Sequence, residues 1–429
     1  MAGAIVAAFA GFILLALPSI GVCGYPWPDN VTQHRGYIEV NQTYGVNLFY
    51  WFFESRGNPA TDPLVVWLTG GPGCSSELGM LMENGPFLIM GSDVPVYNPN
   101  GWNSFANVLY IDNPGGTGFS YVKNSQGYVT DERTIANELW DLIRAFYGLY
   151  PKYANLKLYI TGESYAGHYV PALGQVIVES NSPYAKNLQG LAIGNGWVDP
   201  LIQYQSYAQF ALENNLITQA QFNQAQQLYG PCQSAIQNGD WTTAYGRCSA
   251  LEGFVLETAE RNLGRSINPY DIRLTCPGGG LCYDITNITK FLNRADVQAD
   301  LGVSRTWEAC DNTVLDHLID DWVQNFANAT ATVLLHGKTV VVYSGKEDFV
   351  CDYVGGAEWT NATVWPGQAD FQKEGMHDWV LGGQVVGEAK SADGFIFVAV
   401  EAAGHLVPMN QPQVALSLLE HLVKNEPFY

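Results

Sequence analysis

The chain has 429 residues, 47% of them hydrophobic, which is enough for a large core in one domain that carries an insertion. The formal net charge is −21, and this argues against a nucleic-acid partner, because such a partner favours a basic face. The same charge suits a protein that works in acid, where many carboxylates are neutralised, although solubility alone would also explain it.

The N-terminus predicts a secretory leader. Residues 1–24 contain no charged side chain, 4–17 form an apolar run, Pro18 breaks it, and small residues follow at 21–24. This pattern is typical of a signal peptide that is cleaved near 21–24. Because no basic residue precedes the apolar run, an uncleaved anchor remains an alternative. No later stretch is long and apolar enough to span a bilayer.

Glycosylation motifs and cysteines support the same interpretation. Five N-x-T sequons follow the leader. The acceptors are Asn30, Asn41, Asn287, Asn328 and Asn361. Seven cysteines follow Cys23, and an odd number implies a free thiol or an external partner. We expect the secretory pathway, with a vacuolar or lysosomal compartment or the extracellular space as destination.

The first half of the chain alternates short apolar runs with Gly-rich loops and helical patterns. Strands are expected at 35–40, 46–53, 64–68, 107–112, 156–160 and 188–193, and helices at 131–147 and 170–179. Gly-rich loops follow Leu68, Asp112, Ile160 and Ile193. The alternation predicts a mostly parallel sheet covered on both faces, with ligand sites at the carboxyl ends of its strands.

Residues 200–325 differ in character. They are rich in Gln and Asn, have mostly helical spacing and hold five cysteines. Strand patterns return at 338–343 and 395–400, and a helix is expected at 414–425. We therefore expect an α/β fold with a leader at 1–24, a first core part at 25–199, a helical, disulfide-containing insertion at 200–325 that caps the sheet, and a second core part at 326–429.

A serine lies at one of the strand-to-helix turns. Ser164 is the third residue of Gly162-Glu-Ser-Tyr-Ala166, between the strand at 156–160 and the helix at 170–179. Small neighbours at such a turn are typical of the nucleophile elbow, which holds a hydroxyl above the sheet edge. A Gly-x-Ser turn is common, so an ordinary turn remains an alternative on this motif alone.

An acid and a base follow Ser164 in the chain order that is typical of enzymes with a nucleophile elbow, which is Ser, then Asp or Glu, then His. The strand at 338–343 leads to a loop with Asp348, and the strand at 395–400 leads to a loop with His405. A carboxylate orients an imidazole, which takes the serine proton. Ser164, Asp348 and His405 thus form a candidate catalytic triad. Glu347 is a weaker candidate for the acid, and for His168 we expect a buried, hydrogen-bonded role.

Five longer motifs resemble those of the serine carboxypeptidases, peptidase family S10, and most closely their carboxypeptidase Y-like branch. The motifs are 50–56 (YWFFESR), 67–76 (WLTGGPGCSS), 162–169 (GESYAGHY), 348–351 (DFVC) and 404–408 (GHLVP). The resemblance covers nearly the whole chain after the leader. It implies an α/β-hydrolase fold with a mostly parallel sheet and a largely helical insertion, and it assigns the triad to the same three residues.

The resemblance also implies a transition-state site and a substrate-carboxylate site. The oxyanion hole consists of the backbone N–H groups of Gly71 and Tyr165, and one such donor lowers the barrier by roughly 3 kcal/mol. Glu83 and Glu163, with Thr69 and Gly70, bind the free C-terminal carboxylate of the substrate. A glutamate can donate to that carboxylate only when protonated, so we expect activity in acid.

Thr69 departs from the family pattern, in which Asn usually precedes the two glycines. A hydroxyl can still donate, but its reach is shorter. Serine or threonine also occurs here in plant serine carboxypeptidase-like acyltransferases, so an acyltransferase with the same triad is one alternative. A binding or protective protein with incidental hydrolase activity is another.

The resemblance implies three disulfides, Cys74–Cys310, Cys232–Cys248 and Cys276–Cys282, with Cys351 as the free thiol beside the pocket for the penultimate residue. Leu78 and Leu406 match positions near the pocket for the last residue, which indicates a hydrophobic preference. Trp322 and Tyr165 are expected in the neighbouring pocket. The resulting hypothesis is a serine-type carboxypeptidase that acts on peptides and proteins with a free C-terminus. No metal or cofactor is expected.

Overall fold

One large sheet runs through the molecule in the computed structural model, which describes residues 25–276 and 281–429; the predicted leader lies outside the described residues. The sheet order is β1 (Gln33–Asn41), β2 (Val46–Phe53), β6 (Asn107–Ile111), β3 (Leu64–Thr69), β8 (Leu158–Glu163), β9 (Leu188–Gly194), β10 (Thr339–Gly345), β13 (Phe395–Val400), β12 (Gln384–Ala392) and β11 (His377–Leu381). Strand β7 (Tyr121–Val122) pairs with β2, and β4 (Phe87–Ile89) and β5 (Pro95–Tyr97) form a separate hairpin.

The central strands are parallel. From β6 through β3, β8, β9 and β10 to β13 every neighbouring pair runs in the same direction, whereas the flanking strands pair antiparallel. Every residue of β3 and of β8 is buried. Continuous apolar runs form such strands because helices cover both faces of a parallel sheet. The predicted mostly parallel sheet is confirmed.

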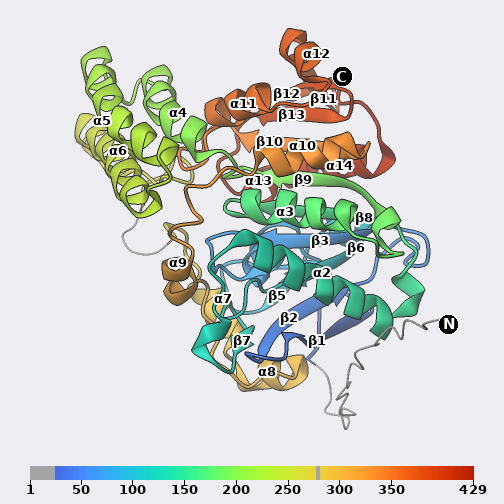
Figure 1. Cartoon of the computed structure of the whole chain (residues 1–429). Coiled ribbons are helices and arrows are strands. Elements are labelled where there is room, and N and C mark those ends of the chain that lie inside the picture. The colour runs from blue at the N-terminus through green and yellow to red at the C-terminus, as the bar shows by residue number, and fades with distance from the viewer. Residues whose placement is uncertain (1–24, 277–280) are drawn as a thin grey trace, which may run out of the picture.

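Helices form a layer on each face of this sheet (Figure 1). One core cluster contains buried side chains of α2 (Glu132–Leu149), α3 (Ala166–Glu179), α10 (Ala327–Leu335) and α11 (Tyr353–Ala362). The other contains those of α1 (Ser76–Gly79) and α14 (Pro412–Lys424). Short helices at Met80–Asn84, Gln368–Lys373 (α12) and Val407–Asn410 (α13) complete the core.

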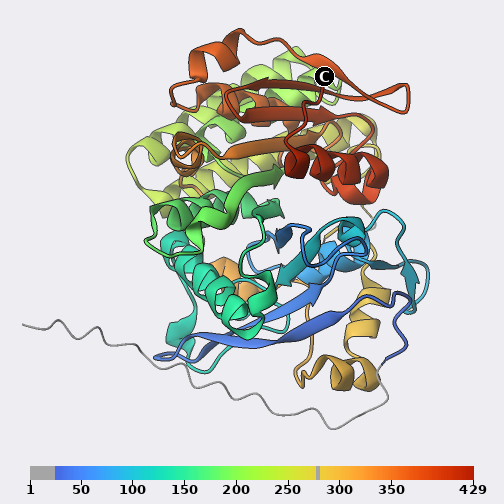
Figure 2. The same cartoon turned by 90° about the vertical axis from the view of Figure 1, so that its right-hand side faces the viewer.

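The described residues between β9 and α10 form helices and no strand of the sheet. These are α4 (Pro200–Glu213), α5 (Gln219–Gln237), α6 (Trp241–Leu263), α7 (Thr286–Leu292), α8 (Ala295–Leu301) and α9 (Asn312–His317). Buried residues of α4, α5 and α6 join the core cluster of α2 and α3, whereas those of α7 and α8 join the cluster of α1 and α14. Figures 1 and 2 show the two groups well apart, and this segment therefore contributes side chains to both core clusters.

The structure joins Cys74 to Cys310, Cys232 to Cys248, and Cys276 to Cys282, and it leaves Cys351 free and buried. These disulfides indicate the secretory pathway. Asn30 and Asn328 are exposed and the other three sequon asparagines are half-buried, and their glycosylation stays a prediction. Within the described part of the chain, every helix is too short or too polar to cross a membrane.

Candidate active site

Ser164 occupies the sharp turn between β8 and α3. Its φ is +67°, in the left-handed region that a non-glycine residue adopts at a cost. A Cβ at Gly162 would lie 2.5 Å from the Leu68 carbonyl oxygen and 2.7 Å from the Ala166 Cβ, so the turn requires small residues. Ser164 is partly exposed, while the other residues of 161–170 are buried. The turn therefore presents its hydroxyl at the surface of the core.

The glycine loop after β3 lies directly against this turn. A Cβ at Gly70 would lie 2.3 Å from the Tyr165 backbone nitrogen and 2.9 Å from the Ser164 Cβ. Gly71, with φ +112°, is partly exposed between buried neighbours. A backbone amide can reach a developing oxyanion only where no side chain crowds it. This surrounding fits the oxyanion role predicted for Gly71 and Tyr165.

Asp348 and His405 lie in the loops after β10 and β13, and their side chains meet. The distance from His405 Nδ1 to Asp348 Oδ2 is 2.7 Å, and both residues are buried. The Val350 and Cys351 backbone N–H groups also donate to Asp348, at 3.0 and 3.2 Å. A carboxylate fixed in this way orients the imidazole, so that Nε2 is left to exchange a proton.

Asn195 belongs to this site, and the sequence analysis missed it. Its Nδ2 donates to Asp348 Oδ2 at 2.7 Å, and its Oδ1 accepts the Gly345 N–H at 3.2 Å. The φ of Asn195 is +40°, and asparagine tolerates this region better than most residues. The signal was a polar residue between two glycines at the end of β9.

A loop between α6 and α7 supports both Asp348 and His405. The Pro269 carbonyl accepts the Phe349 and Val350 N–H groups at 3.0 and 3.1 Å, and the Tyr270 carbonyl accepts the His405 N–H at 2.7 Å. The Tyr270 ring lies 5.2 Å from the His405 ring. These contacts were not predictable from residue types, because backbone carbonyls make them.

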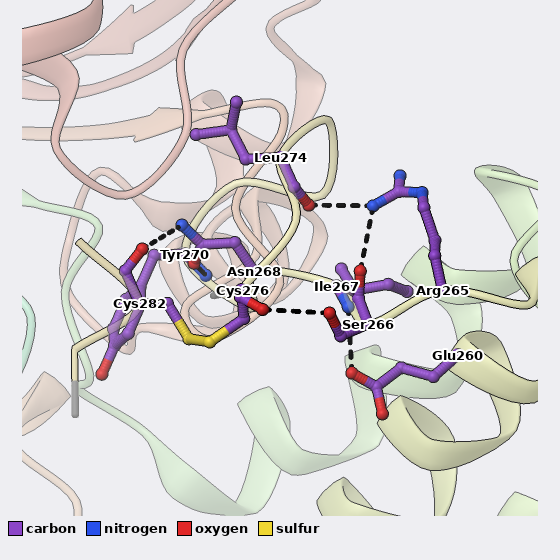
Figure 3. Close-up of a disulfide and its surroundings, with 9 residues drawn as sticks. All are labelled: Glu260, Arg265, Ser266, Ile267, Asn268, Tyr270, Leu274, Cys276 and Cys282. Atoms are coloured by element: carbon purple, nitrogen blue, oxygen red, sulfur yellow. Dashed lines mark hydrogen bonds between the residues drawn. A yellow bond between two sulfur atoms is a disulfide. The ribbon is translucent and has the colours of Figure 1, made fainter. Parts of the chain in front are cut away.

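Figure 3 shows how this loop is held. The Asn268 side chain accepts the Tyr270 N–H at 2.9 Å and donates to the Cys282 carbonyl at 3.3 Å. Ser266 donates to the Cys276 carbonyl at 3.0 Å, beside the Cys276–Cys282 disulfide. Arg265 closes the other side with a bond of 2.9 Å to the Leu274 carbonyl. Several hydrogen bonds and one disulfide thus hold the loop in place close to Asp348 and His405.

Glu83 and Glu163 form a buried carboxyl pair beside Ser164. Their side chains share a hydrogen bond, and one oxygen of each has no partner among the described residues. Burial raises the pKa of Glu83 to about 7. Burial and then the charge of Glu83 raise the pKa of Glu163 well above its ordinary value. The pair therefore retains a proton in mild acid, which it can donate to an anion.

Thr69 is the register partner of Glu163 in the parallel pair β3–β8. Its hydroxyl oxygen accepts the Trp67 indole N–H at 3.0 Å. Because a hydroxyl has one hydrogen and two lone pairs, this bond orients the oxygen and leaves its hydrogen free to donate. Thr69 is therefore compatible with a donor role.

The predicted pocket residues have different surroundings. The Trp322 ring stacks on the Tyr165 ring, with centroids 5.4 Å apart, and is partly exposed. Leu406 is also partly exposed and directly follows His405. Leu78 is buried in the core cluster with Met80 and Leu81. Its position in a substrate pocket stays a prediction.

Cys351 lies next to the acid and the base. Its sulfur, an Asp348 carboxylate oxygen and a His405 ring nitrogen all lie within 4.8 Å of one another. Burial raises the pKa of the thiol well above its usual range. Cys351 is therefore held as a thiol, which is a poor nucleophile.

His168 forms a second histidine–aspartate pair, with Nδ1 3.1 Å from Asp321 Oδ2. It is fully buried, and its ring lies 4.4 Å from each of the Tyr165 and Phe326 rings. The predicted buried, hydrogen-bonded environment is therefore confirmed. Two clusters of side chains bring potential metal-ligand atoms within 4.8 Å of one another: Asp348, Cys351 and His405, and Glu132, His168 and Asp321. The expected absence of a metal stays a prediction.

Comparisons with known proteins agree with this geometry. The family model described as serine carboxypeptidase matches residues 24–425. The chain is 39% identical to serine carboxypeptidase-like 49 of Arabidopsis thaliana over 418 residues, which cover 95% of this chain and 80% of that protein. It is 40% identical to serine carboxypeptidase S10 family member 1 of Dictyostelium discoideum, over 92% of this chain and 94% of that protein.

A solved structure is similar over nearly the whole length. Kex1(delta)p, a prohormone-processing carboxypeptidase from Saccharomyces cerevisiae, has a TM-score of 0.84 and 25% sequence identity, covering 93% of each chain. The predicted α/β-hydrolase fold is confirmed. The chain belongs to the serine carboxypeptidase family, peptidase S10, and is a hydrolase of that family.

Proposed function

We propose that this protein releases the C-terminal amino acid from peptides and proteins in acid, with a preference for hydrophobic last residues. The observation that carries the proposal is the buried Glu83–Glu163 carboxyl pair beside Ser164, in which one oxygen of each carboxyl group has no partner among the described residues. Together with Thr69 and Gly70, the pair offers donors to a free carboxylate and so selects the end of a chain. Leu406 and Leu78 supply the apolar contacts for the last side chain.

In the proposed mechanism, Ser164 Oγ attacks the last peptide carbonyl carbon while His405 Nε2 takes the hydroxyl proton. Asp348 Oδ2 accepts the His405 Nδ1–H and stabilises the imidazolium. The Gly71 and Tyr165 N–H groups stabilise the oxyanion. The C–N bond breaks, and His405 gives its proton to the leaving amine, which departs as the free amino acid.

Water then attacks the acyl-enzyme ester and gives a proton to His405. The ester bond breaks, the shortened peptide leaves with a new carboxylate, and His405 returns the proton to Ser164 Oγ. The acyl side of the substrate lies against Tyr165, Trp322 and Cys351. This assignment, the carboxypeptidase Y-like branch, and a vacuolar, lysosomal or extracellular location are parts of the proposal.

The deciding experiment follows hydrolysis of an N-blocked dipeptide from about pH 4 to pH 8, beside the same dipeptide with a C-terminal amide. Wild type is compared with Ser164→Ala and Glu163→Gln. We expect Ser164→Ala to lose all hydrolysis. Wild type should favour the free carboxylate in acid and lose this preference as the pH rises through about 7, where Glu83 ionises. Equal rates for acid and amide at every pH would refute the carboxylate site.

Thr69 keeps one alternative open, transfer of an acyl group to an alcohol. The discriminating measurement offers an activated ester with water and an alcohol acceptor and determines how the acyl group is divided between them. Predominant transfer would replace the peptidase proposal by the acyltransferase.

A further inference from the structure

One buried carboxylate outside the triad joins three segments of the chain. Asp321 is 2% exposed, and its Oδ2 accepts the Tyr165 hydroxyl at 2.7 Å and lies 3.1 Å from His168 Nδ1. Its Oδ1 accepts the Glu132 backbone N–H at 3.2 Å, at the start of α2. Asp321 thus holds the first turn of α3, the beginning of α2 and its own loop together.

Two further buried side chains, Glu132 and His168, place polar atoms within 4.8 Å of the Asp321 carboxyl group. Burial and then the charge of Asp321 raise the pKa of Glu132 well above its usual range, so Glu132 is a neutral acid. Burial lowers the pKa of His168, and its Nδ1 faces the Asp321 carboxyl oxygen, to which it can donate. Neither Glu132 carboxyl oxygen has a partner among the described residues, and His168 Nε2 also has none there. The side-chain hydrogen bonds of this cluster therefore all end on Asp321.

These bonds act on two residues of the proposed active site. Tyr165 follows Ser164, and its backbone N–H is the proposed oxyanion donor. Trp322 follows Asp321, stacks on the Tyr165 ring, and donates from its indole to the Tyr204 hydroxyl at 3.0 Å. The Trp322 carbonyl accepts the Trp197 indole N–H at 2.9 Å. The main chain at 321–322 therefore links the oxyanion residue to the aromatic residues on the acyl side.

We propose that Asp321 is a positioning residue for the reaction: through the Tyr165 hydroxyl it holds the Tyr165 N–H at the oxyanion and the Trp322 ring against the acyl part of the substrate. Apolar side chains could fill the same space without the desolvation cost of a buried polar group. A carboxyl group that accepts the Tyr165 hydroxyl adds direction, because it fixes the far end of the ring whose own residue carries the proposed oxyanion donor. The inference rests on the proposed function.

The test uses Tyr165→Phe, which removes the hydroxyl and leaves the ring and the backbone N–H. We expect kcat for an N-blocked dipeptide to fall roughly tenfold with little change in KM, because a misplaced donor weakens the transition state rather than substrate binding. The affinity for a peptide aldehyde, whose adduct with Ser164 carries the oxyanion, should fall by a similar factor.

Tyr159→Phe is the matched control. It removes a hydroxyl from the strand that leads to Ser164, and the lost bond goes to the Val423 carbonyl at 3.2 Å on α14. We expect this variant to keep both kcat and aldehyde affinity. Asp321→Asn replaces one accepting oxygen by an NH2 group, which cannot accept from the Tyr165 hydroxyl or from His168. This variant should lose more kcat and more aldehyde affinity than Tyr165→Phe. If it fails to fold, the comparison of Tyr165→Phe with Tyr159→Phe still decides.

Tyr165→Phe with kcat and aldehyde affinity within about twofold of Tyr159→Phe would overturn the inference. A wild-type protein that bound the aldehyde but cleaved no dipeptide would count against the proposed function instead. The aldehyde comparison of the two variants would still test Asp321 in that case.

Discussion

At the scale of single residues, Asn195 shows how the proposed acid, Asp348, is kept in place. Its amide donates to Asp348 at 2.7 Å, and its carbonyl oxygen accepts from Gly345, the last residue of β10. A side chain that directly follows β9 therefore helps the Val350 and Cys351 N–H groups to hold Asp348 in position. A hydrogen bond to a charged group contributes about 1.5–3 kcal/mol.

We therefore predict that Asn195→Ala lowers kcat/KM about ten- to a hundredfold. Asn195→Asp should lower kcat/KM further, because it places a second carboxyl group beside Asp348. Either the two carboxyl groups share a proton, or their combined negative charge stabilises the His405 imidazolium. In the second case the acid limb of the kcat/KM profile moves to higher pH. Profiles of the three proteins test this, and an Asn195→Ala profile identical to wild type would exclude the role.

Cys351 gives a second prediction at this scale. Because burial raises the pKa of its thiol, we expect very slow alkylation by iodoacetamide near neutral pH. A mercurial, which binds thiols strongly, should reach the sulfur and inhibit, since its bulk lies beside His405. Cys351→Ser should hydrolyse the dipeptide and resist the mercurial. If the serine variant is inhibited as strongly as wild type, another group is the target.

Motifs that are local in the chain made part of the site predictable. Ser164, Asp348 and His405 each follow a recognisable strand, in the order that the fold requires. Asn195 and Asp348 are 153 residues apart, and their bond depends on the register of β9 and β10. The Asp321 cluster likewise joins side chains from separate elements, and no local pattern describes such contacts.

At the scale of elements, the sequence predicted the strands that are buried on both faces of the sheet. The parallel strands are continuous apolar runs, and the predicted strand ranges match β1, β2, β3, β6, β8, β9, β10 and β13 to within a few residues. The hairpin β11–β12 was missed, because β11 is an edge strand with only one fully buried residue, Trp379. The division of the helices between two faces was also not predictable, since their polar composition does not encode a partner.

The loop at 265–276 yields a prediction for an element. Asn268→Ala removes the side-chain bonds to the Tyr270 N–H and the Cys282 carbonyl, so the carbonyls that hold Asp348 and His405 lose their support. We expect the free energy of unfolding to fall by about 1–2 kcal/mol and kcat to fall clearly.

Asn293→Ala is the matched control for this loop. Asn293 makes comparable bonds, to the Thr289 and Trp307 backbones, between α7 and α8. We expect a similar loss of stability with unchanged kcat. Denaturant unfolding and initial rates on both variants separate the effects, and equal kcat in the two variants would show that the loop does not support the triad.

At the scale of the whole molecule, buried carboxyl groups make folding sensitive to pH. Burial raises the pKa of Glu83, Glu138, Glu252 and Asp352 to about 7 each. Burial also raises the pKa of Glu77, Glu132 and Glu163 well above the usual range. Their ordinary values are 4.5 for Glu and 3.8 for Asp, so the folded state binds more protons than the unfolded chain in mild acid.

Stability should therefore fall as the pH rises. A group whose pKa is higher in the folded state stabilises fully below its unfolded pKa, and this contribution is lost as the pH rises through the folded value. The window runs from about 4.5 to about 7 for Glu83, Glu138 and Glu252. Some exposed carboxylates act in the opposite direction. Hydrogen bonds from Thr286 and from Arg294 lower the pKa values of Asp284 and Asp296 respectively. Exposed pairs of this kind contribute little to stability. The net charge of −21 at pH 7 adds repulsion in the same direction as the buried groups.

We predict a higher midpoint of denaturant unfolding near pH 5 than near pH 8. Glu138→Gln should lose less stability than wild type over this range, because it removes a buried carboxyl from α2, outside the proposed active site. Glu426→Gln, at an exposed position, should follow the wild-type curve. A midpoint that rises from pH 5 to pH 8 would mean that the buried carboxyl groups ionise without cost in the folded protein, and it would also remove the physical basis for expecting Glu83 and Glu163 to share a proton in acid.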